Sequence, residues 1–180
     1  MNALEAVLED GGLSLVPFRI EHTGALREAC ARAPAIWEIY PVNMLEGDAE
    51  AMLKRFHGEQ GWVRFSVLVD GAVVGTTSYI NPDLANGTVM IGGTYIEPSA
   101  RGTGVNRRMK RLMIDHAIAC GYWRIEFTVD TRNLRSMAAM EKLGAVREGI
   151  LRKNRVTWTG YVRDTALYAI LAEDWQATHA

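Results

Sequence analysis

The sequence predicts a mixed α/β fold (α+β type) in which a mostly antiparallel central sheet is flanked by helices. Three observations predict it. Residues 62–96 read as three consecutive strands separated by the turn signals Asp70-Gly71 and Asn86-Gly87. Residues 105–143 read as helix, strand and helix from the spacing of their apolar residues. The first 60 residues carry mainly short helical stretches.

The three consecutive strands form a predicted antiparallel meander. Their segments are rich in β-branched and aromatic residues and are Trp62–Val69, Ala72–Ile80 and Thr88–Ile96. Gly92 and Gly93 lie inside the last strand. Glycines at that place indicate a bulge, or a point where a ligand or another backbone comes close.

The other elements follow from apolar spacing and from cap residues. Before the meander we expect a strand at Leu13–Phe18, helices at Glu21–Arg32 and Asp48–His57, and an aromatic-rich connection between Pro34 and Pro41. After it we expect a helix at 105–120 ended by Gly121, a strand at Arg124–Val129, a helix from an N-cap at Asn133 to Leu143 with Gly144 as its stop, and strands near Ala145–Leu151 and Thr165–Leu171, with Trp175 closing the core.

The length of 180 residues fits a single domain spanning 1–180, with residues 1–11 as a flexible or peripheral N-terminal extension. No run of about 18 apolar residues predicts a membrane span, and the acidic first residues do not resemble a signal peptide. Two cysteines, Cys30 and Cys120, indicate a reducing compartment without a disulfide framework, so we expect a cytoplasmic protein.

The net charge of −1 hides a segregation of charge along the chain. Residues 1–60 sum to −5, residues 61–100 to −2, residues 101–163 to +9 and residues 164–180 to −3. Such asymmetry can mark an anion-binding half, although basic helix faces are often only solvated.

The loop at 97–104 and the helix that follows it carry the clearest functional signal. A glycine-rich loop opening a helix presents free backbone N–H groups and the positive end of the helix dipole, which together bind anions. Arg101, Arg107 and Arg108 crowd the same terminus. Cations are unfavourable there unless an anion offsets them, and phosphate is the natural candidate, although the arginines can also point to solvent or to acidic neighbours. The spacing fits neither the Walker loop nor the dinucleotide-binding pattern.

The segment Arg101–Asn106, RGTGVN, resembles the Gln/Arg-x-x-Gly-x-Gly/Ala signature of the GNAT superfamily of acetyl-CoA-dependent N-acetyltransferases. Further motifs are similar to its RimJ/RimL-type branch, and the resemblance covers about residue 12 to Trp175. Those motifs are Asp130-x-x-Asn133-x-x-Ser136, Glu141–Gly144, Arg147–Gly149 and Arg163–Thr165.

The resemblance implies acetyl-CoA as co-substrate and a place for each part of it. The pyrophosphate is expected on the backbone amides of Gly102, Thr103, Gly104, Val105 and Asn106, beside Arg101 and Arg107. The pantetheine arm is expected to pair with Thr94 and Ile96 like an added strand and to contact Asn133. The sheet must therefore splay between its fourth and fifth strands, 88–96 and 124–129.

The catalytic groups are less clear. The resemblance places Ser136 near the thioester, although Ser136 can equally belong to the helix cap. Many members of the family carry a tyrosine that protonates the leaving thiolate, and Met140 stands at that position here. The stretch 152–155 lacks the glutamate base of RimL-like relatives. Glu97 is the preferred base, or a loop-capping carboxylate, with Glu126 and Asp164 as alternatives.

Trp37, Glu38 and Tyr40 are expected to bind the acceptor, with Trp62 and Trp158 as further candidates, although aromatic residues are often core. The acidic first third would attract a cationic amine. We therefore predict transfer of an acetyl group to a primary amine, such as a protein or peptide N-terminus, an amino acid or another small amine.

A CoA-binding module with little or no catalysis is the alternative, suggested by the missing tyrosine and glutamate. Nucleic acid is a disfavoured partner, because few aromatic residues interleave the arginines. The histidines lack metal-ligand spacing, so no metal is expected, and a homodimer is left open.

Overall fold

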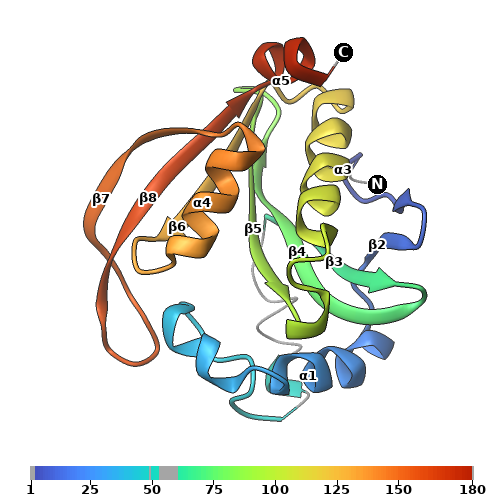
Figure 1. Ribbon diagram of the computed structural model, residues 1–180, viewed down its shortest axis with the longest axis vertical. Coiled ribbons are helices and arrows are strands. Elements are labelled where there is room, and N and C mark those ends of the chain that lie inside the picture. Colours follow the sequence, from blue (N-terminus) through green and yellow to red (C-terminus); the bar gives the residue numbers. More distant parts are fainter. Residues whose placement is uncertain (1–2, 49, 53–60, 180) are drawn as a thin grey trace.

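The computed structural model describes residues 3–48, 50–52 and 61–179. Its strands form an eight-stranded sheet in the order β1-β2-β3-β4-β5-β6-β8-β7, with helices on both faces (Figure 1). The mixed fold predicted from the sequence is confirmed. Every neighbouring pair of strands is antiparallel except β5 and β6.

The meander consists of β3 (Trp62–Val69), β4 (Ala72–Asp83) and β5 (Thr88–Ile96). Asp70 and Gly71 both adopt positive φ, 49° and 81°, as a two-residue hairpin turn requires. The predicted bulge is present, because the register of β4 with β5 shifts between Thr76 and Ser78. Opposite this shift Gly93 has φ +59°, and an added Cβ would lie 2.9 Å from the ring of Trp62. The strand can bend there because the residue is glycine.

The N-terminal part adds two strands and three short helices. These elements are β1 (Leu8–Asp10), β2 (Leu13–Pro17), η1 (Ile20–His22), α1 (Thr23–Ala31) and η2 (Pro34–Ile39). The first eleven residues are peripheral in the sense that β1 is the edge strand of the sheet, but Leu4 is fully buried in the main core. The helix expected at Asp48–His57 lies largely outside the described residues.

The C-terminal part supplies the rest of the sheet and its larger helices. The elements are η3 (Pro98–Ala100), α3 (Val105–Ala119), β6 (Arg124–Asp130), α4 (Leu134–Leu143), β7 (Val146–Val156), β8 (Val162–Leu171) and α5 (Ala172–His179). Strands β4, β7 and β8 are longer than predicted, because the β7–β8 hairpin continues pairing beyond Leu151, with Arg155 opposite Arg163 and Val156 opposite Val162. Trp175 is buried, as predicted.

The sheet splays between β5 and β6, the strands expected to separate. The two strands pair in parallel only at Thr88 with Arg124, Val89 with Ile125 and Met90 with Glu126. Beyond these pairs they diverge, and α3 and α4 lie on either side of the opening in Figure 1. The second half of β5 therefore turns an edge toward an opening in the middle of the molecule.

Two apolar clusters hold this architecture. The larger one packs α3 and α4 against the sheet. The smaller one packs α1 and η2 against the opposite face of β5, where Tyr95 donates a hydrogen bond to the Ala29 carbonyl (2.7 Å). Cys30, in this second cluster, and Cys120 are both free. None of the helices in the described ranges is long and apolar enough to span a membrane.

Candidate active site

The loop before α3 ends in a helix N-terminus that carries no side-chain cap. Gly102 and Gly104 have φ of +78° and +89°, a backbone region that favours glycine. Gly104 is the N-cap residue, and the first turn of α3 contains no acidic side chain. The backbone N–H groups of this turn and the positive end of the helix dipole therefore face the opening without a carboxylate of their own helix, which suits an anion.

Arg101 is anchored beside this N-terminus but has one unsatisfied donor. Its Nε donates to the carbonyl of Ile96 (2.7 Å), and its guanidinium lies 5.6 Å from the ring centre of Tyr95. Its Nη2 is buried and has no hydrogen-bond partner. A buried cationic donor without a partner is costly in a protein interior. The atom fits a site whose ligand supplies an anionic acceptor.

The remaining arginines of α3 differ from one another. Arg107 is exposed. Arg108 is engaged with the edge of the sheet, where its Nε donates to the Asp10 carboxylate (2.6 Å) and its Nη2 to the Asp10 carbonyl. This partner lowers the pKa of Asp10. Of these two arginines, Arg107 is thus the one left available for an anion at this N-terminus.

The diverging half of β5 presents backbone carbonyls that side chains already reach. Tyr40 of η2 donates its hydroxyl to the Thr94 carbonyl (2.7 Å), and Arg101 reaches the Ile96 carbonyl from the other end. Burial raises the pKa of Tyr40 to about 12, so this phenol is a neutral donor at neutral pH. Thr94 and Ile96, the positions expected to pair with an extended ligand, are therefore the two carbonyls of β5 contacted in this way.

Lys110 is a residue that the sequence interpretation missed. Its Nζ donates to Thr94 Oγ1 (2.8 Å), which in turn shares a hydrogen bond with Thr77 Oγ1 (2.9 Å), and it lies 5.7 Å from the ring centre of Phe127 on β6. The residue is buried, and burial lowers the pKa of its amine to about 7. The signal was available, because Lys110 stands one helical turn before Met113 and Ile114 on the apolar face of α3.

Glu97 is occupied by structural partners. Its side chain is buried, with one carboxylate oxygen 2.5 Å from Arg32 Nη1 and the other accepting from Ser99 Oγ (2.5 Å). Its backbone N–H closes the sheet on the Val74 carbonyl (2.8 Å). An ion-paired carboxylate that fixes the start of the loop is poorly suited to accept a proton from a substrate amine.

The two alternative carboxylates are engaged as well. Glu126 accepts from Arg124 Nε (2.7 Å), and Asp164 accepts from the backbone N–H of Lys153 (2.7 Å). The geometry therefore favours no single side-chain carboxylate as the base.

The start of α4 is capped by its own chain. Asn133 Oδ1 accepts from the backbone N–H of Ser136 (3.0 Å), as expected of an N-cap. Ser136 thus belongs to the first turn of α4, across the opening from β5. Met140, one turn further along, is buried in the main core.

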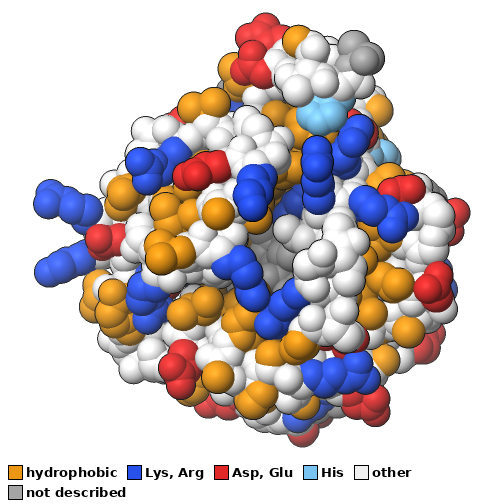
Figure 2. Space-filling model, viewed as in Figure 1, with side chains coloured by type: hydrophobic (Ala, Val, Ile, Leu, Met, Phe, Trp, Pro, Cys, Tyr) orange, Lys and Arg blue, Asp and Glu red, His pale blue; other side chains and the backbone are white. Residues whose placement is uncertain are grey.

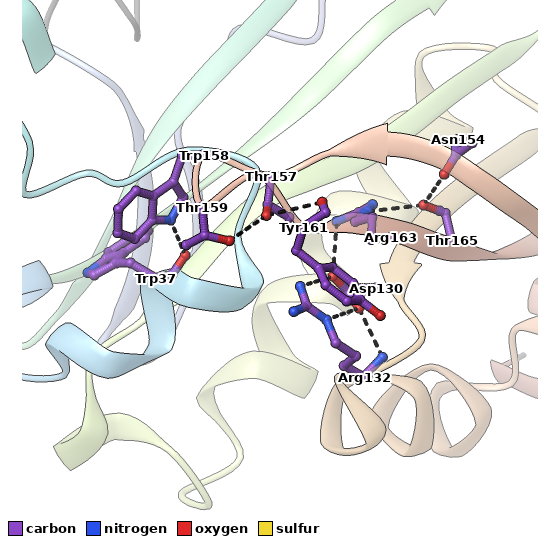
Figure 3. A network of polar contacts seen from close by, with 10 residues as sticks. All are labelled: Trp37, Asp130, Arg132, Asn154, Thr157, Trp158, Thr159, Tyr161, Arg163 and Thr165. Carbon is purple, nitrogen blue, oxygen red and sulfur yellow. Dashed lines mark hydrogen bonds and ion pairs between the residues drawn. The ribbon is translucent and has the colours of Figure 1, made fainter.

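A polar network forms the wall on the acceptor side, and Figure 3 shows its members. At the tip of the β7–β8 hairpin, Trp158 donates its indole N–H to the Trp37 carbonyl (2.7 Å), which ties the hairpin to η2. Deeper in the wall, Asp130 binds Arg132 (2.7 Å) and lies 4.0 Å from Arg163, and these cations lower the pKa of the Asp130 carboxyl despite burial. Arg132 also stacks over Tyr161, 3.8 Å from its ring centre.

The three residues expected to bind the acceptor occupy different environments. The Trp37 side chain is 1% exposed and stacks on Tyr95, so it is core and not a pocket rim. Tyr40 is the phenol at Thr94, and Glu38 is exposed and close enough for its charge to raise the pKa of Arg132. Trp62, another candidate, packs against Gly93 at the bulge instead.

Charge around the opening is mainly positive. Figure 2 shows Lys and Arg side chains gathered around the hollow in the middle of this face, over the space between α3 and α4. Among the described residues, no group of three or more His, Cys, Asp or Glu side chains is arranged to hold a metal ion.

Comparison with known proteins decides the family. Residues 13–146 match the family model described as an acetyltransferase (GNAT) domain, about three quarters of the chain. The chain belongs to the GNAT family. The match includes the diverging strands, the glycine loop and α3, but ends before most of the β7–β8 hairpin.

The relatives of this GNAT protein agree in fold. The probable N-acetyltransferase YjcK of Bacillus subtilis is 39% identical over 83 residues, which are 46% of this chain and 45% of that protein. A solved probable acetyltransferase of the GNAT family from Chromobacterium violaceum is 28% identical, with TM-score 0.88 over 96% of this chain and 89% of that one. RimL, a ribosomal L7/L12 α-N-protein acetyltransferase solved with coenzyme A, is 17% identical with TM-score 0.81, covering 94% and 99%.

Proposed function

We propose that this GNAT protein transfers an acetyl group from acetyl-CoA directly to a primary amine. One observation carries the proposal: an uncapped helix N-terminus, with the buried unpartnered Nη2 of Arg101 beside it, lies next to the unpaired half of β5. The first of these features suits a diphosphate, and the second suits an extended amide-containing arm.

Each part of the co-substrate then has residues to hold it. The amides of residues 102–106, with Arg101 and Arg107, would bind the pyrophosphate. Thr94 and Ile96 would pair with the pantetheine arm, and Asn133 would contact it from α4. Bound in this way, acetyl-CoA supplies the activated acyl group, and the protein supplies its position and N–H donors for the thioester carbonyl.

The proton of the attacking amine needs another route than Glu97. Because Arg32 and Ser99 hold both of its carboxylate oxygens, Glu97 serves to fix the loop. Water in the opening is the simplest acceptor of the proton. Ser136 in the first turn of α4 remains our proposed donor near the departing sulfur, because Met140 offers no proton there.

The acceptor is proposed as a primary amine, with protein or peptide N-termini, amino acids and other small amines as the candidates. Exposed Glu38 beside Arg132 is the acidic group on that side of the opening. A cationic amine would be attracted to it before it loses its proton. The likeness to RimL supports the fold and leaves the choice among these acceptors to experiment.

The test is release of free CoA from acetyl-CoA across a panel of small amines, amino acids and N-terminal peptides, with CoA binding measured in parallel by calorimetry. Turnover with at least one amine, blocked when that amine is already acetylated, is the expected result. CoA binding without turnover of any amine would favour a CoA-binding module with little or no catalysis. Absence of CoA binding would contradict both functions.

A further inference from the structure

Lys110 places a primary amine inside the protein, in the opening between the diverging strands. It comes from α3, its Nζ donates to Thr94 on β5, and it lies over the ring of Phe127 on β6. The residue is 4% exposed. The amine therefore sits between the two strands that separate, beside the carbonyl edge proposed to bind the pantetheine arm.

The groups around this amine do not hold it as a charged ammonium. From β5 and β4 it meets the hydroxyls of Thr94 and Thr77, from β6 an aromatic ring, and from η2 the neutral phenol of Tyr40 reaches the backbone of Thr94. Within the described residues, no ion pair includes Lys110, and burial is the cause of its lowered pKa, about 7. A substantial fraction of this amine is uncharged at neutral pH, whereas an ordinary lysine is almost fully protonated.

An uncharged primary amine beside a thioester is chemically equivalent to the proposed acceptor. We propose that Lys110 is an internal acetyl acceptor, and that acetyl-CoA bound in the opening acetylates its Nζ. This inference rests on the proposed function, because it uses the same acyl donor in the same place. It assigns a modification site to a residue for which the transfer reaction itself has no need.

The step is an ordinary acyl transfer. The lone pair of Nζ forms a bond to the acetyl carbon, the carbon–sulfur bond breaks, and the sulfur leaves as thiolate. The proton lost by Nζ passes, directly or through water, to that thiolate, which gives free CoA and N-acetyl-lysine. No further reactant is required. The product carries no charge, so the modification removes one cation from the opening.

The chain offers its own controls, since it has four lysines: Lys54, Lys110, Lys142 and Lys153. Lys142 and Lys153 are exposed. Purified protein incubated with acetyl-CoA and no added amine, then analysed by peptide mass spectrometry, should carry acetyl at Lys110 at least tenfold faster than at the two exposed lysines. Lys110→Arg should abolish that modification, and the matched exposed variant Lys142→Arg should leave it unchanged.

The pH dependence separates a buried amine from an exposed one. With a pKa of about 7, the uncharged fraction rises about ninefold between pH 6 and pH 8 and then levels off. An ordinary lysine gains roughly 100-fold over the same interval and continues to rise to pH 9. Acetylation of Lys110 should follow the first curve, and acetylation of Lys142 and Lys153 the second.

The donor distinguishes failure of this inference from failure of the proposed function. Acetic anhydride, which needs no binding site, should favour the exposed lysines, so a preference for Lys110 with acetyl-CoA alone would show delivery from the opening. If acetyl-CoA binds and amines are turned over while Lys110 stays unmodified, the inference is wrong and the proposed function stands. If acetyl-CoA does not bind, both are wrong.

Discussion

The N-termini of α3 and α4 lie on either side of the same opening and are built in opposite ways. α4 begins with Asn133, whose side chain accepts the N–H of Ser136 (3.0 Å). α3 begins with Gly104 in the left-handed region, without a side-chain cap, and its first turn contains Arg107 and Arg108 but no acid. One helix satisfies its own first turn, and the other presents donors and cations together.

This difference teaches where to look for a ligand in an uncharacterised member of a fold. A capped N-terminus is stable by itself, and capping contributes about 1 kcal/mol. An uncapped one with cations beside it is unfavourable by itself, because those cations face the positive end of the dipole. The buried unpartnered nitrogen of Arg101 adds to this imbalance. An anion resolves all of these features at once.

The largest expected effect tests the glycine that leaves α3 uncapped. Gly104→Val forces a β-branched residue to φ +89° and turns the first amides of α3 away from a common centre. Losing two charge-assisted hydrogen bonds should weaken CoA binding by 100-fold or more, on the order of 3 kcal/mol, measured by calorimetry.

Gly144→Val is the matched control for that variant. Gly144 ends α4 with φ +95°, and an added Cβ at either glycine meets no atom within 4 Å. Both substitutions should therefore lower the free energy of unfolding by a similar amount, about 1–2 kcal/mol. Only Gly104→Val should reduce CoA affinity, and equal losses of affinity in the two variants would contradict the assignment of the anion site to α3.

The next effect concerns the donor of Arg101. Arg101→Met keeps the length of the side chain but removes the unpartnered Nη2 and the hydrogen bond to the Ile96 carbonyl. CoA affinity should fall by about tenfold or more, as expected for a hydrogen bond to a charged group. Thermal unfolding without ligand provides the contrast, since the loss of a buried unpartnered cation should leave the melting temperature nearly unchanged or raise it. Unchanged CoA affinity would show that Arg101 only supports β5.

The features found from the sequence were those with a local cause. The turns at Asp70-Gly71 and Asn86-Gly87, the bulge at Gly93 and the cap at Asn133 each follow from residues that are neighbours in the chain. The splay between β5 and β6 was reached through the family resemblance, since local periodicity carries no information on where two strands separate.

What the sequence could not show depends on contacts between distant segments. The ion pair of Glu97 with Arg32 joins residues 65 positions apart and turns a candidate base into a structural group. Trp37 was assigned to a pocket rim, but Tyr95 from β5 stacks on it and makes it core. Lys110 looked like one more cation in a basic helix, although its place on the apolar face of α3 had marked it as buried.

A smaller effect tests the capped helix. Asn133→Ala removes the acceptor of the Ser136 N–H, so the free energy of unfolding should fall by about 1 kcal/mol in chemical denaturation. Asn133→Asp keeps an acceptor at the cap and should retain the stability. Because Asn133 is also proposed to contact the pantetheine arm, CoA affinity should fall in both variants. Loss of stability alone in Asn133→Ala would reduce this residue to its capping role.

The smallest expected effect separates the two arginines of the first turn of α3. Arg107→Gln should weaken CoA binding by about two- to fivefold at low salt, because this exposed cation is available to an anion at the N-terminus. Arg108→Gln should change it by less than twofold, since the Asp10 carboxylate already balances that guanidinium at 2.6 Å. Both effects should shrink at high ionic strength, because exposed charges are screened. An equal loss in the two variants would mean that Arg108 leaves Asp10 when the ligand binds, and Asp10→Asn would then raise CoA affinity by freeing the same guanidinium.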